Sequence, residues 1–190
     1  VVAANSISGS KDIKAAVVRY GKVMGSRGSV IPFFISKRDQ GASELPITDM
    51  RMTRFNISLE AGVDLVMFAI GHHLGGEIFI PKIPSYKIGD VATAIAPNIK
   101  QIEIGIRPGE KLHEEMITAT DALNTIDLGE YYAILPSVSF KHQKDEYIKH
   151  HNAVMVPEGF HYSSDSNDQW ESVESIREKI VEFVDPNFTV

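Results

Sequence analysis

The 190-residue sequence predicts an α/β fold, because strand-like and helix-like segments alternate along most of its length. Apolar runs of the kind found in buried strands occur at residues 15–21 and 77–82. Between them, residues 59–70 carry apolar side chains at helical spacing. A composition with 43% hydrophobic and 23% charged residues is typical of a globular domain. These observations favour an α/β core with a smaller mixed α/β subdomain.

The first part of the chain is expected to supply a helix end, a strand and a helix. VVAANSISGSKD has the pattern of a last helical turn that ends near Ser8 and Gly9, and residues 15–21 follow as a strand. A loop with three glycines leads from this strand to VIPFFISKRDQ, which is expected to be helical because Pro32 suits a first turn. The stretch SELPITDMRMTRFNIS has neither period and is interpreted as a short strand with a loop.

Two amphipathic helices are expected in the middle of the chain. Ser58 is a candidate N-cap for the first, and its apolar stripe predicts the face that meets the core. That stripe consists of Leu59, Val63, Val66, Met67 and Ile70. Ser85 is expected to open the second helix, which Pro97 closes. Its apolar stripe consists of Ile88, Val91, Ala92 and Ile95.

The last part of the chain is expected to contain two strands and two helices. Residues 102–106 alternate like a strand, residues 111–117 follow a turn and are predicted to be helical, and residues 131–136 form a strand. Asp168 and Glu171 have the spacing of a capping box before a C-terminal helix.

Composition excludes several classes of protein. The net charge of −6 and the scattered basic residues argue against a nucleic-acid binder. The absence of cysteine excludes disulfides, thiolate catalysis and cysteine-ligated metal centres. No apolar run approaches the roughly 18 residues of a membrane span. We therefore expect a soluble protein that does not bind membranes, with the cytoplasm as its default location.

The tetrapeptide Arg107-Pro108-Gly109-Glu110 is a candidate anion site. Its position between a predicted strand and a predicted helix leaves backbone N–H groups free, and the Arg107 guanidinium suits two-point contact with phosphate oxygens. Glu110 suits the hydroxyls of a ribose. The alternative is a structural turn in which Arg107 pairs with Glu110 or Glu114.

Two loops are weaker candidates for ligand binding. The glycine-containing stretch 19–29 follows a buried strand, where open α/β sheets bind ligands, although its composition favours an ordinary flexible turn. The stretch LPITDMRMTRF carries Thr48, Thr53, Arg51 and Arg54, which also fit solvated surface positions. The paired histidines lack metal-ligand spacing and no G-x-S-x-G motif occurs, so we assign neither a metal site nor a catalytic residue.

Five blocks of the sequence resemble, in order, the C-terminal part of configuration-inverting UDP-N-acetylglucosamine 4,6-dehydratases. The blocks are RYGKVMGSRGSVIPFF, LPITDMRMTRFNISLEAGVDLV, GGEIFIPKIPS, IGIRPGEKLHEEMI and FHYSSDSNDQW. These enzymes are extended short-chain dehydrogenases/reductases among the polysaccharide biosynthesis proteins. The resemblance covers essentially the whole chain, and it implies the last parallel strands and helices of a Rossmann fold with a small mixed α/β substrate-binding subdomain.

The resemblance implies an NADP-dependent lyase. Such an enzyme oxidises C4 of UDP-N-acetylglucosamine, removes water across C5 and C6, and returns the hydride to C6 with inversion at C5. The product is a 4-keto-6-deoxy nucleotide sugar for surface glycans, including pseudaminic acid. The resemblance also implies a homo-oligomer in the complete enzyme.

The resemblance assigns roles to individual residues by motif. Arg107 and Glu110 are implied to contact the diphosphate and ribose of UDP, and Thr48 the uridine region. Val30 is a further substrate contact and Arg54 a weaker candidate for the phosphates. The residues implied to pass the nicotinamide end of NADP are Val23, Met24, Gly25, Ser26 and Arg27.

Two residues depart from the family pattern. Lys22 stands where the family has an asparagine that touches the substrate, and its longer cationic side chain would either reach the diphosphate or block the sugar. Asn56 stands where the family has a tryptophan, so an apolar plate near the site is lost. Both departures bear on affinity and activity.

The catalytic Tyr-x-x-x-Lys pair of the family is absent, since none of the six tyrosines has a lysine four residues later. We expect a C-terminal half that is inactive alone and is completed by an N-terminal NADP-binding half. Residues 1–45 and 58–82 are expected to be a remnant of the Rossmann core, and residues 46–57 and 83–190 the substrate-binding subdomain. Two alternatives stay open: a non-catalytic UDP-sugar-binding or assembly module, and another nucleotide-sugar epimerase or dehydratase.

Overall fold

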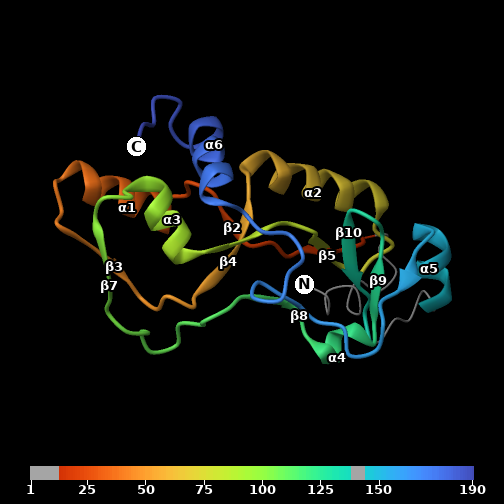
Figure 1. Ribbon diagram of the computed structural model, residues 1–190. Helices are drawn as coiled ribbons and strands as arrows, with labels where there is room; N and C mark the ends of the chain where they lie inside the picture. Colours follow the sequence, from red (N-terminus) through yellow and green to blue (C-terminus); the bar gives the residue numbers. More distant parts are fainter. Residues whose placement is uncertain (1–12, 138–143) are drawn as a thin grey trace. The chain divides into compact units, whose positions relative to one another are not determined.

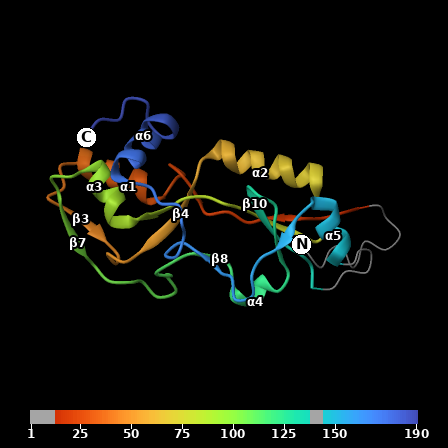
Figure 2. The same ribbon diagram turned by 45° about the vertical axis from the view of Figure 1, so that its right-hand side comes forward.

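The computed structural model describes residues 13–137 and 144–190, and Figures 1 and 2 show its ribbon from two sides. The expected helix end near Ser8 and Gly9 lies outside the described residues. The chain divides into two compact units, each assembled from three segments. Unit 1 consists of Val1–Tyr20, Glu60–Lys82 and Glu115–Tyr162; unit 2 consists of Gly21–Leu59, Ile83–Glu114 and Ser163–Val190.

Unit 1 is built on a five-stranded sheet in the order β1-β5-β10-β9-β11. β1 and β5 are parallel, and the other neighbouring pairs are antiparallel. The strands are β1 (Val17–Val18), β5 (Ile78–Pro81), β9 (Thr125–Asp127), β10 (Tyr131–Ile134) and β11 (Val154–Met155). The other elements are α2 (Leu59–His72), β8 (Glu115–Ile117), α4 (Ala119–Ala122), α5 (Lys144–His151) and β12 (Tyr162–Ser163), which falls on the boundary between the units. The strands predicted at residues 15–21, 77–82 and 131–136 are confirmed.

The helix α2 packs on this sheet with a face that the sequence did not predict. Its buried residues are Gly62, Leu65 and Ala69, and the last two join a core that includes Phe79 and Ile126. The predicted core stripe is exposed instead, with 37% to 64% of each side chain accessible: Leu59, Val63, Val66, Met67 and Ile70. Because both faces of α2 are apolar, helical spacing alone could not identify the face that meets the sheet.

A buried carboxylate fixes the turn between α2 and β5. Glu77 is fully buried and accepts hydrogen bonds from the backbone N–H groups of Leu74 (2.6 Å) and Gly75 (2.7 Å). The ring of His151 at the end of α5 lies 3.5 Å from the same carboxylate, and the Tyr147 hydroxyl donates to the carbonyl of Gly75. Glu77 therefore ties α5 to the start of β5.

Unit 1 is expected to lose stability in acid through Glu77. Burial raises the pKa of this carboxyl, but its hydrogen bonds with His151, Leu74 and Gly75 outweigh burial and hold the pKa below the ordinary value of 4.5. Since the folded pKa is depressed, the stabilisation is present above pH 4.5 and is lost as the pH falls through the folded pKa. The Glu77→Gln variant should be less stable at neutral pH and should lose less stability between pH 5 and pH 3, as followed by urea unfolding at each pH. An unchanged acid profile would contradict this role.

Unit 2 has two small sheets and three helices around one core. One sheet has the order β2-β4-β6, with β2 and β4 parallel; the other pairs β3 with β7 in parallel. The strands are β2 (Lys22–Val23), β3 (Glu44–Ile47), β4 (Thr53–Ile57), β6 (Ser85–Lys87) and β7 (Lys100–Glu103). The helices are α1 (Val30–Asp39), α3 (Ile88–Ile95) and α6 (Val173–Phe183). The predicted apolar stripe of α3 is buried, as are Ile176 and Ile180 of α6.

The division into units differs from the expected boundaries in two places. Residues 21–45 cluster with unit 2, because α1 packs against α3 and shares its core. Residues 115–162 cluster with unit 1, because β9, β10 and β11 extend its sheet.

The prediction of a helix at residues 111–117 is wrong. The chain is irregular up to Glu114 and then enters β8. Its polar groups bond to β4 rather than to one another: the Thr53 N–H donates to the carbonyl of Leu112 (3.2 Å), and the Phe55 N–H donates to the carboxylate of Glu114 (3.0 Å). These tertiary hydrogen bonds override the local helical pattern.

Two predicted helix starts are also displaced. Ser85 lies in β6, and α3 begins three residues later at Ile88 after the N-cap Lys87. The capping box of α6 is formed by Ser172 and Ser175 rather than by Asp168 and Glu171. Glu171 instead accepts hydrogen bonds from Ser175 and Lys179, and it is buried.

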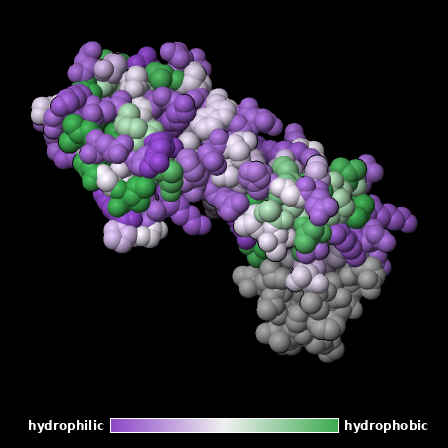
Figure 3. Space-filling model, turned by 60° about the horizontal axis from the view of Figure 1, so that its bottom comes forward, coloured by the Kyte–Doolittle hydropathy of each residue, from purple (hydrophilic) through white to green (hydrophobic). Residues whose placement is uncertain are grey.

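No helix in the described part of the chain is both long and apolar enough to span a bilayer. The face turned forward in Figure 3 is largely hydrophilic, and its hydrophobic residues lie in several separate groups.

Candidate functional site

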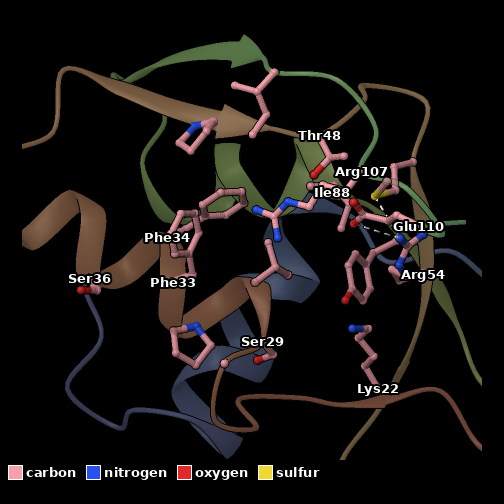
Figure 4. A pocket seen from close by; sticks show the side chains of 17 residues that line it. Lys22, Ser29, Phe33, Phe34, Ser36, Thr48, Arg54, Ile88, Arg107 and Glu110 are labelled. Atoms are coloured by element: carbon pink, nitrogen blue, oxygen red, sulfur yellow. Dashed lines mark hydrogen bonds and ion pairs between the residues drawn. The ribbon is translucent and has the colours of Figure 1, made fainter. Parts of the chain in front are cut away.

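A cavity of about 530 Å³ lies within unit 2, a size typical of small-molecule sites. Its walls come from β2, the turn before α1 and α1 itself, β3 and the segment after it, β4, β6, the start of α3 and the segment after β7. The lining residues are Lys22, Gly28, Ser29, Val30, Pro32, Phe33, Phe34, Ser36, Pro46, Thr48, Met52, Arg54, Tyr86, Ile88, Ile104, Arg107 and Glu110. The structure therefore brings together all six residues that the family resemblance implied as substrate contacts. Figure 4 shows this cavity from close by.

Residues Arg107 to Glu110 form a hydrogen-bonded turn beside the cavity. The N–H of Glu110 donates to the carbonyl of Arg107 at 3.0 Å, and Gly109 has a φ of 79°. Proline followed by a glycine of positive φ is the pattern of a type II turn. The side chains of Arg107 and Glu110 consequently leave the backbone close to one another. The turn does not begin a helix, so the predicted contribution of free helical N–H groups is wrong.

Arg54 anchors the segment that follows this turn. Its guanidinium donates to the carbonyls of Thr53 (2.6 Å), Lys111 (2.9 Å) and Leu112 (3.0 Å). It also lies 3.9 Å from the carboxylate of Glu110 and 3.7 Å from that of Glu114. Because Arg54 is only 7% exposed, these contacts are largely shielded from water. Arg54 thus pairs with the two carboxylates that had been alternative partners for Arg107.

Arg107 and Lys22 supply unpaired positive charge. Within the described ranges, neither side chain forms an ion pair or hydrogen bond, and both residues are exposed. In Figure 4, Arg107 extends into the cavity from the side of Thr48 and Glu110, whereas Lys22 enters from a different strand. An anionic ligand between them would meet cations from two directions.

The carboxylate of Glu110 retains an unused acceptor. Its Oε2 atom is buried and has no hydrogen-bond partner in the described part of the chain. Its other oxygen faces Arg54. A buried carboxylate oxygen without a donor favours a ligand that brings hydroxyl or N–H groups.

The apolar wall of the cavity was not predicted from the sequence. The ring centroids of Phe33 and Phe34 on α1 lie 5.7 Å apart, and Phe33 is 42% exposed. Both lie on the side of the cavity away from Glu110 in Figure 4. An exposed aromatic ring beside unpaired cations suits a ligand that combines a flat ring with anionic groups. The adjacent aromatics after Pro32 were the available signal, but in sequence they are indistinguishable from core residues.

The implied cofactor loop, residues 23–27, does not line this cavity. Met24 is 8% exposed and belongs to the core of unit 2, so its side chain is not available to a ligand. Gly25 has a φ of 70°, and a Cβ there would lie 2.8 Å from the side chain of Val184. The loop is thus packed against unit 2, and Ser26 and Arg27 are its exposed residues.

Arg51 is excluded from the cavity by a local ion pair. Its guanidinium binds both carboxylate oxygens of Asp49, at 3.0 and 2.7 Å. Hydrogen bonding from Arg51 lowers the pKa of Asp49 to about 2. Asn56 also lies outside the cavity lining, where its amide faces the carboxylate of Glu171 at 3.4 Å.

The chain matches one protein family over most of its length. The family model described as polysaccharide biosynthesis protein matches residues 1–136. A protein of Campylobacter jejuni subsp. jejuni serotype O:2, named UDP-N-acetylglucosamine 4,6-dehydratase (inverting), is 51% identical over 182 residues, which is 94% of this chain and 54% of that protein. A protein of Rickettsia canadensis named UDP-glucose 4-epimerase is 45% identical over 122 residues, or 62% of this chain and 36% of that protein.

A solved structure supports the same relationship. Pen from Bacillus thuringiensis superposes with a TM-score of 0.80 at 32% identity, covering 96% of this chain and 54% of that chain. This confirms the predicted α/β fold class. The chain spans about half the length of the Campylobacter relative and of Pen. From the family match and these identities, the chain belongs to the polysaccharide biosynthesis protein family.

Proposed function

We propose that this chain is the UDP-sugar-binding part of a UDP-N-acetylglucosamine 4,6-dehydratase (inverting). The observation that carries the proposal is the turn at Arg107 and Glu110, which places an unpaired guanidinium and an unsatisfied carboxylate oxygen at one cavity. The Campylobacter relative, which carries that name, is 51% identical over nearly the whole chain. Site chemistry and relatives thus support the same ligand class.

The cavity matches the parts of a nucleoside diphosphate sugar. Of the three cationic side chains that line it, Arg54 is paired with Glu110 and Glu114, whereas Lys22 and Arg107 are unpaired, and these two unpaired charges suit a diphosphate. Glu110 would accept hydrogen bonds from ribose hydroxyls through its free oxygen. Thr48 would contact the uracil, and the ring of Phe33 supplies an apolar surface on the other side of the cavity. Lys22 then lies toward the sugar or its phosphate.

Proton transfer is not assigned to this chain. The reaction proposed for the complete enzyme oxidises C4, eliminates water across C5 and C6, and returns the hydride to C6. The sequence has no Tyr-x-x-x-Lys pair to remove the C4 proton. NADP is part of the proposal as the hydride carrier, and the exposed residues of loop 23–27 are what this chain would offer it. A cytoplasmic location, a homo-oligomer and a role in pseudaminic acid synthesis belong to the same proposal.

A second candidate is a UDP-binding module without catalysis. It is favoured by the replacement of the family asparagine with Lys22 at the cavity wall. The other departure, Asn56, lies outside the cavity and leaves its lining unchanged. The two candidates differ in turnover once a polypeptide with the Tyr-x-x-x-Lys pair is supplied, together with NADP and UDP-N-acetylglucosamine.

The binding proposal is tested by calorimetric titration with UDP, UMP and uridine. We expect UDP to bind most tightly, because the second phosphate meets the unpaired cations, and uridine to bind most weakly. Each charge-assisted contact is worth about 1.5–3 kcal/mol, so UDP should exceed uridine by at least about tenfold. Equal affinity for the three ligands, or no binding of any, would overturn the proposal.

The Lys22→Asn variant restores the family residue. We expect it to weaken UDP binding by about fivefold or less, because Lys22 is exposed and its charge acts in a high dielectric. The affinity of the variant should also depend less on salt concentration. The exposed Lys100 on β7 lies outside the cavity, so Lys100→Ala controls for the loss of one charge. If Lys22→Asn instead binds UDP-N-acetylglucosamine more tightly than the unmodified chain does, Lys22 blocks the sugar.

A further inference from the structure

A second hollow of about 480 Å³ lies within unit 2, beside the start of α3. We call it the α3 hollow and define it by its lining residues: Met50, Lys87, Gly89, Asp90, Thr93, Ile99 and Gln101. Among the described residues, it shares none with the lining of the cavity at Arg107. Ile88, which lies between Lys87 and Gly89 in the chain, lines that cavity instead. The α3 hollow is therefore separate from the proposed UDP site.

The side-chain amide of Gln101 is fixed so that its oxygen lacks a donor. Its Nε2 atom donates to the hydroxyl of Thr93 (2.9 Å) and to the carbonyl of Gly89 (3.2 Å). The Thr93 hydroxyl itself donates to the carbonyl of Gly89 (2.9 Å), so its oxygen is an acceptor for Gln101. These contacts leave Oε1 of Gln101 buried, without a hydrogen-bond partner in the described ranges. A buried carbonyl oxygen of this kind favours a ligand that brings an N–H or O–H group.

Gly89 keeps space open beside this oxygen. A Cβ atom at residue 89 would lie 3.3 Å from Oε1 of Gln101 and 3.3 Å from Cε of Met50. Gly89 lies in the first turn of α3 and does not have a positive φ, so its backbone conformation does not require glycine. The missing side chain provides room instead. The methyl group of Met50 borders this space, and its flexible side chain, 46% exposed, can move aside when a ligand donor approaches Oε1.

Two side chains of opposite charge complete the lining. Lys87 is exposed, and its ammonium lies 6.0 Å from the centre of the Trp170 ring. Asp90 is half-buried in the first turn of α3. Neither side chain forms an ion pair with another described residue. The positive end of the helix accounts for the charge of Asp90, but it accounts neither for the unpaired oxygen of Gln101 nor for the space at Gly89.

We propose that the α3 hollow binds a small zwitterion of the amino acid type. The ammonium group of the ligand would donate to the two acceptors, Oε1 of Gln101 and the carboxylate of Asp90. Its carboxylate would meet the ammonium of Lys87, and its apolar part would lie on Met50 and Ile99. A purely anionic ligand would place negative charge beside Asp90 and leave Oε1 of Gln101 without a donor. A purely cationic ligand would leave Lys87 without a partner.

An NMR titration of this chain with L-leucine and two analogues tests the proposal. Leucine carries both charges, isoamylamine lacks the carboxylate, and isocaproate lacks the ammonium. We expect leucine to bind with a Kd in the millimolar range and isocaproate at least about tenfold more weakly, because isocaproate brings no donor to either acceptor. Isoamylamine should bind about two- to fivefold more weakly than leucine, because Lys87 is exposed.

The same titration locates the ligand. The signals of the Gly89 N–H, the Gln101 side-chain amide and the Met50 methyl group should shift as leucine is added, because all three border the unpaired oxygen. The methyl signals of Met67 and Met155 should not shift, because both residues belong to unit 1.

Gly89→Ala should block the site without removing a charge or a hydrogen bond. The new Cβ fills the space beside Oε1 of Gln101, so leucine should bind at least about tenfold more weakly. The melting temperature should fall by no more than about 4 °C, because alanine is the better helix former. Gly71→Ala is the matched control, since Gly71 also lies in a helix, α2, and a Cβ there would have no atom within 4 Å. It should bind leucine like the unmodified chain.

Asp90→Asn provides a second variant that keeps the shape of the α3 hollow. It should weaken the binding of leucine and isoamylamine by about two- to fivefold, because both ligands carry the ammonium group that faces Asp90. The affinity for isocaproate should not fall, because this ligand has no ammonium. An equal loss for all three ligands would contradict the assignment of Asp90 to the ammonium.

Four further results would overturn the proposal. The absence of a saturable shift with leucine, glycine or glutamate up to about 100 mM would show that the α3 hollow holds only solvent. Equal affinity for leucine, isoamylamine and isocaproate would show that neither charge is recognised. Shifts at Lys22 and Arg107 in place of Gly89 would assign the amino acid to the other cavity. Unchanged leucine binding in a folded Gly89→Ala variant would show that the ligand does not approach Gln101.

These titrations contain no UDP, and the α3 hollow shares no lining residue with the UDP cavity among the described residues. A failure of this proposal therefore leaves the proposed function untouched, and the reverse holds as well.

Discussion

Replacing Arg107 with alanine should weaken UDP binding by about 10- to 100-fold and leave folding stability unchanged. A charge-assisted hydrogen bond contributes about 1.5–3 kcal/mol, and a guanidinium in two-point contact with phosphate makes two of them. Stability should not change, because the Arg107 side chain has no ion pair or hydrogen bond within the described residues. Calorimetric titration with UDP and urea unfolding of the same preparations measure the two effects.

The controls for Arg107 separate specific contact from net charge. Lys100→Ala removes an exposed cation on β7, whose ion pair with Glu44 is also exposed, so it should bind UDP like the unmodified chain. The loss of affinity in Arg107→Ala should be large for UDP and small for uridine, because uridine has no phosphate for Arg107 to bind. An equal loss for both ligands would contradict a phosphate contact, and an unchanged UDP affinity would remove the basis of the proposed function.

Much of this site could be predicted because the chemistry is local in sequence. Arg107, Pro108, Gly109 and Glu110 are consecutive, and Pro-Gly in the centre of a turn brings the outer two side chains together whatever follows. The full lining of the cavity could not be predicted in this way, because it includes residues that are distant in the sequence. Lys22 lies on β2 and Thr48 follows β3, so the two residues reach the same cavity only through the tertiary packing of unit 2.

Other predictions failed where tertiary contacts determine the local conformation or the buried face of a helix. Residues 111–117 have a plausible helical pattern, but hydrogen bonds to Thr53, Arg54 and Phe55 hold the chain along β4 instead. The α2 stripe was assigned to the core because apolar periodicity marks a buried face. Periodicity does not say what buries that face, and in α2 the smaller residues Gly62 and Ala69 allow closer approach to the sheet.

Replacing Arg54 with methionine should cost about 3–5 kcal/mol of stability and also abolish measurable UDP binding. Removing one partner of a buried ion pair costs this much, since the other groups remain desolvated without a partner. Arg54→Met would leave the carbonyls of Lys111 and Leu112 and the carboxylates of Glu110 and Glu114 without this donor. The turn that presents Arg107 would then lose its attachment to β4. Urea unfolding and UDP titration report the two losses.

Replacing Arg54 and replacing Arg107 are therefore expected to have different effects, although both side chains line the cavity. Arg107→Ala should lower only the affinity for UDP, whereas Arg54→Met should lower both this affinity and the folding stability. Arg54→Lys should recover part of the folding stability, because it keeps the charge. Arg177→Met is the matched control, because Arg177 likewise donates to backbone carbonyls but lies outside the cavity. Its two acceptors are the carbonyls of Ala94 (3.0 Å) and Thr93 (3.4 Å). It should cost only about 1 kcal/mol of stability and no affinity. If Arg54→Met is as stable as the unmodified chain but still fails to bind UDP, Arg54 contacts the phosphates directly instead of holding the turn.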